Sequence, residues 1–212
     1  MRTRCAQCLR PPRACLCALV RPVHSPVQLL VLQHPAEVLE AKGTARLLHL
    51  CLPGSRLEVG ERFDPAQLAA WLHAPWRAGD APRHGVLLYP PTPDGDSLGL
   101  AASAPWPCPA PAPDALRLIV LDGTWRKSRK MLYANPALQT LPRLALAHAP
   151  SSRYGELRKA QAAHQRSTLE ATACALAQLH PAGPAPRALW QAFEGLLAQQ
   201  AALRPPFARN TA

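Results

Sequence analysis

Four cysteines near the start of the chain have the spacing of a metal site. They lie within thirteen residues as Cys-x2-Cys-x6-Cys-x-Cys, namely Cys5, Cys8, Cys15 and Cys17. Thiolates bind zinc tetrahedrally, and two close pairs joined by a short loop can surround one ion without a large core. We therefore predict a closed, structural zinc site. Two disulfides are disfavoured in a reducing compartment, and this spacing is not usual for an iron–sulfur cluster.

A second group of reactive side chains follows an apolar run in the middle of the chain. Residues 116–121 read Leu-Arg-Leu-Ile-Val-Leu and predict a buried strand. This strand would deliver four residues to the carboxyl edge of a sheet, where open α/β folds bind ligands: Asp122, Gly123, Thr124 and Trp125. Four basic residues follow directly: Arg126, Lys127, Arg129 and Lys130. A carboxylate beside this excess of positive charge indicates a functional role, because an acid needed only for solubility would not require such a setting.

The same residues also have a purely structural interpretation. Asp122 and Thr124 would form a strand-end turn that caps the next helix, and Trp125 is more often a core residue than a platform for stacked bases. Three other predicted strand ends carry specialised residues as well, at 33–37, 89–91 and 153–170. Because the ends of parallel strands converge on one edge, an active site there is the simplest interpretation of all four.

The formal charge of +11 is unevenly distributed along the chain. Residues 1–36 hold five arginines and no acid, and residues 126–166 hold nine basic residues against Glu156 alone. Such clusters on an otherwise nearly neutral body favour binding to a polyanion such as nucleic acid. Coding in a GC-rich genome would explain the preference for arginine over lysine, but it does not explain the clustering.

Alternation of apolar runs and helical patterns predicts the elements that position these residues. We expect strands at 27–33, 57–59, 85–89, 116–121 and 143–147, and helices at 36–51, 65–73, 126–133, 168–179 and 187–203. The last strand is weak, and Gly43 weakens the first helix. Ser167 and Glu170 match the Ser-x-x-Glu pattern of a capping box at a helix start, which is compatible with a place in a ligand pocket.

The order of these elements indicates an α/β fold, with a mostly parallel sheet covered by helices on both faces. At 212 residues, the chain fits one domain over residues 25–212 and a small zinc-binding element over residues 1–24. A proline-rich segment at 90–113 predicts a surface loop. The dinucleotide and phosphate-loop glycine motifs are missing, which argues against a standard NAD enzyme or a P-loop NTPase.

The composition also indicates where the protein works. Every apolar run is shorter than the ~20 residues that a membrane span requires, so we expect a soluble protein with no membrane partner. The first residues lack the apolar core of a secretory signal, from which we expect a cytoplasmic location with reduced thiols.

The chain resembles the DTW-domain family, which is named for the Asp-x-Thr-Trp signature that stands here at 122–125. The resemblance extends over most of the chain in matching order: the four cysteines, residues 33–37, Tyr89-Pro90, the signature, Tyr154 with Arg158-Lys159, and residues 167–171. Members of this family are tRNA-uridine aminocarboxypropyltransferases. The resemblance therefore implies transfer of the 3-amino-3-carboxypropyl group of S-adenosylmethionine to N3 of a tRNA uridine, in a fold related to the knotted SPOUT methyltransferases.

The resemblance also implies roles for individual residues. Asp122 would act as the general base for uridine N3, with Thr124 fixing the turn and Trp125 lining the adenosine or packing structurally. The predicted donor-binding residues are Tyr89, Pro90, Gly123, Arg158, Ser167, Thr168 and Glu170. The predicted tRNA-binding residues are Arg126, Lys127, Arg129, Lys130 and Lys159. Arg158 or Lys159 would hold the donor carboxylate or a tRNA phosphate. The proline-rich loop after Tyr89 departs from the family pattern.

Two alternative functions stay open at this point. One is RNA methylation from the same donor in the same fold. The other is a zinc-containing RNA-binding module without catalytic activity.

Overall fold

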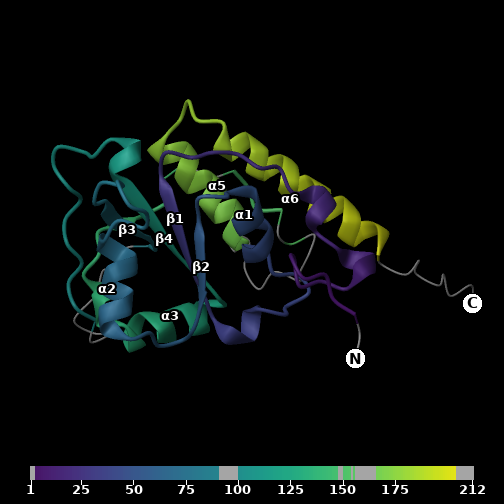
Figure 1. Cartoon of the computed structure of the whole chain (residues 1–212), viewed down its shortest axis with the longest axis horizontal. Coiled ribbons are helices and arrows are strands. Elements are labelled where there is room, and N and C mark those ends of the chain that lie inside the picture. Colours follow the sequence, from purple (N-terminus) through teal and green to yellow (C-terminus); the bar gives the residue numbers. More distant parts are fainter. Residues whose placement is uncertain (1–2, 91–99, 148–149, 154, 156–165, 204–212) are drawn as a thin grey trace, which may run out of the picture.

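The computed structural model describes residues 3–90, 100–147, 150–153, 155 and 166–203, and its centre is a parallel sheet (Figure 1). The sheet has five strands in the order β2-β1-β4-β3-β5. Their bounds are β1 Gln28–Gln33, β2 Arg56–Val59, β3 His84–Leu88, β4 Leu116–Asp122 and β5 Arg143–Leu144. The predicted α/β class with a parallel sheet is confirmed.

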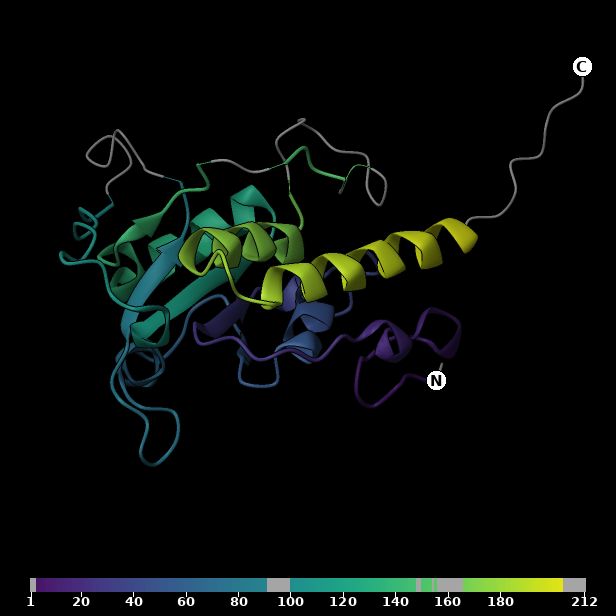
Figure 2. The same ribbon diagram turned by 90° about the horizontal axis from the view of Figure 1, so that it is seen from above.

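Helices cover both faces of the sheet and enclose two separate cores (Figures 1 and 2). On one face lie the helices α1, α5 and α6, with bounds Ala45–Cys51, Thr168–Leu179 and Ala185–Ala202. On the other face lie α2, α3 and α4, with bounds Pro65–His73, Trp125–Ala134 and Pro136–Gln139. Successive side chains of a strand point to opposite faces, so each central strand contributes to both cores. None of the helices in the described ranges is both long and apolar enough to cross a membrane.

The two central strands end side by side. In the register of β1 with β4, Gln33 lies opposite Asp122, and both are the last residues of their strands. The backbone N–H of His34 continues this pairing by donating to the carbonyl oxygen of Asp122 over 2.9 Å. The carboxyl edge of the sheet is therefore fixed at the residue that begins the Asp-x-Thr-Trp signature.

The N-terminal segment packs directly on this frame. It holds two short 3-10 turns, η1 Pro12–Ala14 and η2 Cys17–Leu19, and Figure 2 shows it running beside α6. Cys8 and Leu16 are buried in the same core as α1, α5 and α6. Arg10 is buried too, and its Nη2 donates to the carbonyl oxygen of Gly43 over 2.8 Å. The four-cysteine segment therefore shares the first core of the larger unit.

Two predicted elements are shorter than expected. The helix predicted at 36–51 is instead a 3-10 turn, η3 Pro35–Glu37, followed only later by α1. Leu39 is exposed there, and the carbonyl of Gly43 bonds to Arg10, so this stretch gains no core contact from a helical conformation. The strand predicted at 143–147 has two residues, because β3 leads into Pro90 and Pro91, which lack the N–H groups that would extend the ladder. Within 100–112 the proline-rich segment contains no helix or strand, as predicted.

The capping box predicted at the start of α5 is confirmed. The Ser167 hydroxyl accepts from the Glu170 N–H at 3.2 Å, and the Glu170 carboxylate accepts from the Ser167 N–H at 2.8 Å. The same carboxylate, which is fully buried, also accepts from the Arg153 N–H at 2.8 Å and from the Ser152 hydroxyl at 3.3 Å. Glu170 thus ties the segment at 152–153 to the start of α5.

We expect Glu170→Gln to destabilise the fold by about 1–3 kcal/mol, because an amide NH2 would face N–H donors that now bond to a carboxylate oxygen. Urea unfolding followed by circular dichroism measures this difference. The same substitution at Glu58, which lies on the edge strand β2, is the matched control. Equal stability of the two variants would contradict this role of Glu170.

Candidate functional site

The carboxylate of Asp122 is buried where β1, β4 and α5 meet. The residue is 5% exposed. Its Oδ2 accepts a hydrogen bond from Nε2 of Gln33 over 2.8 Å, and its Oδ1 accepts one from the hydroxyl of Thr168. Each carboxylate oxygen can accept more than one hydrogen bond, so these two contacts leave acceptor capacity at both oxygens. The structure therefore brings Asp122 and Thr168, two predicted site residues, into direct contact.

Burial raises the pKa of the Asp122 carboxyl above its usual range. The hydrogen bonds from Thr168 and Gln33 act in the opposite direction, the negative charge of Glu37 raises the pKa further, and Lys127 lowers it. The net effect is upward because water that would stabilise the charged form is excluded. A carboxylate with a raised pKa binds a proton more readily, which is the property that a general base requires.

The turn after Asp122 is closely packed against α3. A Cβ atom at Gly123 would lie 3.0 Å from Cβ of Lys127, so a larger residue would push the helix away. The hydroxyl of Thr124 accepts a hydrogen bond from the Lys127 N–H over 3.4 Å, which confirms the predicted cap at this position. Gly123 and Thr124 thus fix the angle at which α3 leaves the sheet edge.

Trp125 is 51% exposed, so its interpretation as a core residue is wrong. It stands edge-on to the buried Tyr89, with ring centroids 5.7 Å apart and an interplanar angle of 74°. Burial raises the pKa of the Tyr89 hydroxyl, while a hydrogen bond with Ser128 of α3 opposes that shift. Tyr89 therefore packs against Trp125 in a T-shaped pair, and about half of Trp125 stays exposed to solvent.

The predicted site residues divide between the two faces of the sheet. Asp122 contacts α5 through Thr168, whereas Tyr89 belongs to the core formed with α2, α3 and α4. Ser167 and Glu170 are buried in the capping box on the α5 side, and Pro90 is exposed just beyond β3. Arg158 and Lys159 lie outside the described residues, so their predicted roles stay predictions.

Half of the predicted basic cluster on α3 is neutralised by acids. Lys127 Nζ lies 2.6 Å from Oε1 of the buried Glu37, and Lys130 Nζ lies 2.9 Å from Oε1 of Glu61. Glu61 also bonds to Nε2 of His34 over 3.0 Å. Because these pairs join α3 to the segments after β1 and β2, Lys127 and Lys130 position the helix as well as adding charge.

Two residues that contact the site were assigned no individual role from the sequence. Gln33 begins the predicted strand end at 33–37, and the structure shows it to be the hydrogen-bond partner of Asp122. Arg143 lies over the Tyr89 ring at 5.4 Å, with Nε and Nη1 buried and lacking hydrogen-bond partners among the described residues. Its position at the start of a two-residue edge strand gave no signal of this contact.

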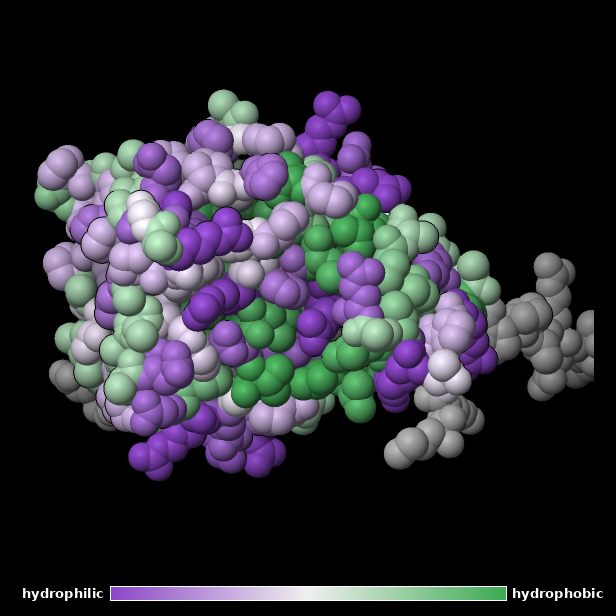
Figure 3. Space-filling view, viewed as in Figure 1, coloured by the Kyte–Doolittle hydropathy of each residue, from purple (hydrophilic) through white to green (hydrophobic). Residues whose placement is uncertain are grey.

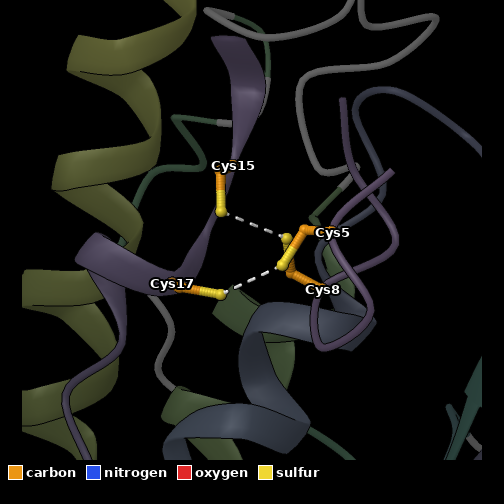
Figure 4. A group of neighbouring side chains, drawn as sticks. All are labelled: Cys5, Cys8, Cys15 and Cys17. Carbon is orange, nitrogen blue, oxygen red and sulfur yellow. Dashed lines mark hydrogen bonds between the residues drawn. The ribbon is translucent and has the colours of Figure 1, made fainter. Parts of the chain in front are cut away.

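The four cysteine sulfurs converge on one point near the N-terminus (Figure 4). All four lie within 4.8 Å of one another, and the pairs Cys5–Cys17 and Cys8–Cys15 have sulfurs 3.6 Å apart. Tetrahedral zinc with Zn–S bonds of ~2.3 Å requires sulfurs about 3.8 Å apart, so the cluster fits the ion. Hydrogen bonds from the backbone of Cys8 and Gln7 lower the pKa of Cys5 to about 6, whereas burial and the neighbouring thiols raise the pKa of Cys17 to about 12, so the first thiolate of the cluster forms at Cys5.

Comparisons with known proteins place the chain in a family. The model of the DTW domain family matches residues 2–201. A Macaca fascicularis protein named tRNA-uridine aminocarboxypropyltransferase 2 is 28% identical over 182 residues, covering 84% of this chain and 57% of its own length. The Drosophila melanogaster protein of the same name is 32% identical over 182 residues, covering 84% of this chain and 67% of its own length.

The chain thus spans little more than half of the Macaca fascicularis relative. No solved structure matches it. Because the family model extends over nearly the whole chain, from the cysteine cluster through the signature to α6, the protein belongs to the DTW domain family.

Proposed function

We propose that this protein transfers the 3-amino-3-carboxypropyl group of S-adenosylmethionine to N3 of a tRNA uridine. The observation that carries the proposal is the buried Asp122, which has a raised pKa and stands at the carboxyl edge of the sheet inside the family signature. The names of the relatives support the same activity and imply both the donor and the tRNA.

The chemistry assigns Asp122 a defined step. Uridine N3 carries a proton at neutral pH, and Asp122 would accept this proton as the bond from N3 to the donor's γ-carbon forms. The bond between that carbon and the sulfonium sulfur breaks, and its electron pair stays on sulfur. Since the sulfonium is already a good leaving group, the protein must mainly align N3 behind the γ-carbon rather than behind the methyl group.

The start of α5 and the end of β3 supply the groups proposed to hold the donor. Thr168 reaches Asp122 directly, and Ser167 and Glu170 fix the backbone around it through the capping box. Tyr89, Pro90 and Gly123 border the same carboxyl edge, with Arg158 as the proposed partner of the donor carboxylate. In this arrangement Glu170, which is fully buried, acts by positioning the loop rather than by touching the donor.

We further propose a SPOUT-like fold for the domain. The place of β4 between β1 and β3, both of which precede it in the chain, supports this proposal, as does the return of α5 to the end of β4. The knotted topology implied by the resemblance stays a prediction. A cytoplasmic location is proposed because a site of free thiolates needs a reducing compartment.

The four cysteines are proposed to hold a structural zinc ion. The sulfur separations fit four-coordinate zinc, which leaves no position for substrate. The ion would fix the N-terminal segment to the first core, to which Cys8 and Leu16 belong. Cys5, Cys8, Cys15 and Cys17 would then contribute to stability and not to the transfer step.

We expect Asp122→Asn to abolish aminocarboxypropyl transfer while the protein stays folded. Asparagine keeps the size of the side chain, and the Gln33 amide can turn to accept from its NH2 group. Mass spectrometry of tRNA nucleosides, after incubation with protein and donor, measures the product. Asp114→Asn, at an exposed aspartate, is the matched control. Full activity of Asp122→Asn would contradict the role of the base, and a methylated uridine from the unmodified protein would favour the methyltransferase alternative.

The raised pKa of Asp122 predicts how stability depends on pH. A folded-state pKa above the unfolded value means that stability is greatest below the unfolded pKa and is lost as the pH rises through the folded pKa. Asp122→Asn removes this dependence, so its melting temperature should equal or exceed that of the unmodified protein at neutral pH. Thermal unfolding at acidic and neutral pH measures the difference. A marked loss of stability at neutral pH would show that the ionised carboxylate stabilises the fold.

Removal of the metal should destabilise the N-terminal segment. We expect one zinc ion per chain, and we expect Cys8→Ser to lower both zinc content and stability, by at least about 2 kcal/mol. Elemental analysis and chelator-dependent melting provide the measurements. The control is Cys108→Ser, at an exposed cysteine outside the cluster, which should change neither the zinc content nor the stability. A protein that is folded and equally stable without metal would contradict this proposal.

A further inference from the structure

Helix α3 exposes three planar side chains in one line. Trp125, Arg129 and Tyr133 are spaced four residues apart, and residues at this spacing lie on the same side of a helix. Trp125 is 51% exposed, Tyr133 is 42% exposed, and Arg129 is exposed between them. At 1.5 Å of rise per residue the stripe is about 12 Å long. We call Trp125, Arg129 and Tyr133 the α3 stripe.

The charge of α3 is concentrated on its two arginines. Lys127 and Lys130 are paired with Glu37 and Glu61, whereas Arg126 and Arg129 make no ion pair within the described part of the chain. Figure 3 shows strongly hydrophilic side chains projecting along the edge of the molecule where α3 lies in Figure 1. A guanidinium differs from an ammonium because it is planar and can stack on a nucleobase as well as attract phosphate.

The Trp125 ring is held in place before any ligand arrives. Its edge contact with the buried Tyr89 restricts it, and Tyr89 is itself held by Ser128 and by the guanidinium of Arg143. Large exposed aromatic side chains beside unpaired cations are the combination found in proteins that bind single-stranded nucleic acid. A fixed ring loses little conformational freedom when a base stacks on it.

We propose that the α3 stripe stacks the unpaired bases that flank the target uridine, so that the enzyme takes single-stranded tRNA loops as its substrate. This inference rests on the proposed function for its target atom. Uridine N3 lies on the Watson–Crick edge, which is occupied in a duplex, so the reacting uridine must be unpaired or flipped out. The stripe begins three residues after Asp122, and its length matches about three stacked nucleotides at ~3.4 Å each.

Binding without donor tests this proposal separately from catalysis. The probe is a short single-stranded RNA with one central uridine, compared with the same RNA annealed to its complement. Trp125→Ala should weaken binding to the single strand roughly 5- to 100-fold, and Trp125→Phe should retain most of the affinity. Arg129→Lys keeps the positive charge but replaces the planar guanidinium with an ammonium that cannot stack. It should therefore weaken binding to the single strand without changing the salt dependence of the affinity. Arg187→Lys, at an exposed arginine on α6, is the control.

Two results would overturn the proposal. One is unchanged single-strand affinity in both Trp125→Ala and Arg129→Lys. The other is an equal loss of affinity for the single strand and the duplex, which would leave only phosphate contacts on this surface. If the variants bind as expected but the unmodified protein forms no aminocarboxypropyl product, the stacking role of the α3 stripe stands and the proposed transferase activity is wrong. If the aminocarboxypropyl product forms and the variants bind the single strand with unchanged affinity, the transferase activity stands and the stacking role of the α3 stripe is wrong.

Discussion

Burial of one carboxylate at the junction of β1, β4 and α5 is the constraint on which the site depends. Asp122 ends β4, Gln33 ends β1, and Thr168 begins α5, so their hydrogen bonds join three elements that are far apart in the sequence. An isolated buried charge is costly, and these two donors offset part of that cost. The part of the desolvation free energy that these hydrogen bonds do not offset raises the pKa of Asp122. The packing of the sheet edge therefore sets the proton affinity of the proposed base.

The lysines of α3 show how a basic helix can be oriented by acids. Lys127 and Lys130 contact carboxylates that come from the ends of β1 and β2, so the helix is held against the same edge that presents Asp122. Their charges are then partly neutralised, and the exposed positive charge of α3 is carried by Arg126 and Arg129. The formal charge of the four basic residues is therefore larger than the charge available to attract a polyanion. Most of the available charge lies on the two arginines, whose guanidinium groups are planar.

Local patterns predicted the parts of the structure that depend on neighbours in sequence. The apolar runs gave β1, β3 and β4, and the Ser-x-x-Glu pattern of Ser167 and Glu170 gave the start of α5. Features that depend on distant contacts were missed. The helix expected at 36–51 is broken near Gly43, which weakens it and whose carbonyl oxygen bonds to Arg10. The exposure of Trp125 follows from the orientation that Thr124 and Gly123 impose on α3. No periodicity in the sequence contains this information.

The division of the site between two faces of the sheet limits how substrates can be arranged. Asp122 reaches its partners on the α5 face, whereas Trp125 and Tyr89 stand on the α3 face, and only the carboxyl edge of β4 connects them. A nucleotide strand that lay along α3 would have to turn one base over this edge to reach Asp122. Gly123 lies at the crossing, where a Cβ would stand 3.0 Å from Cβ of Lys127, so this close turn against α3 favours a residue without a side chain. The short Asp-x-Thr-Trp segment thus spans both faces, with the proposed base Asp122 at one end and the ring of Trp125, proposed to stack on RNA bases, at the other.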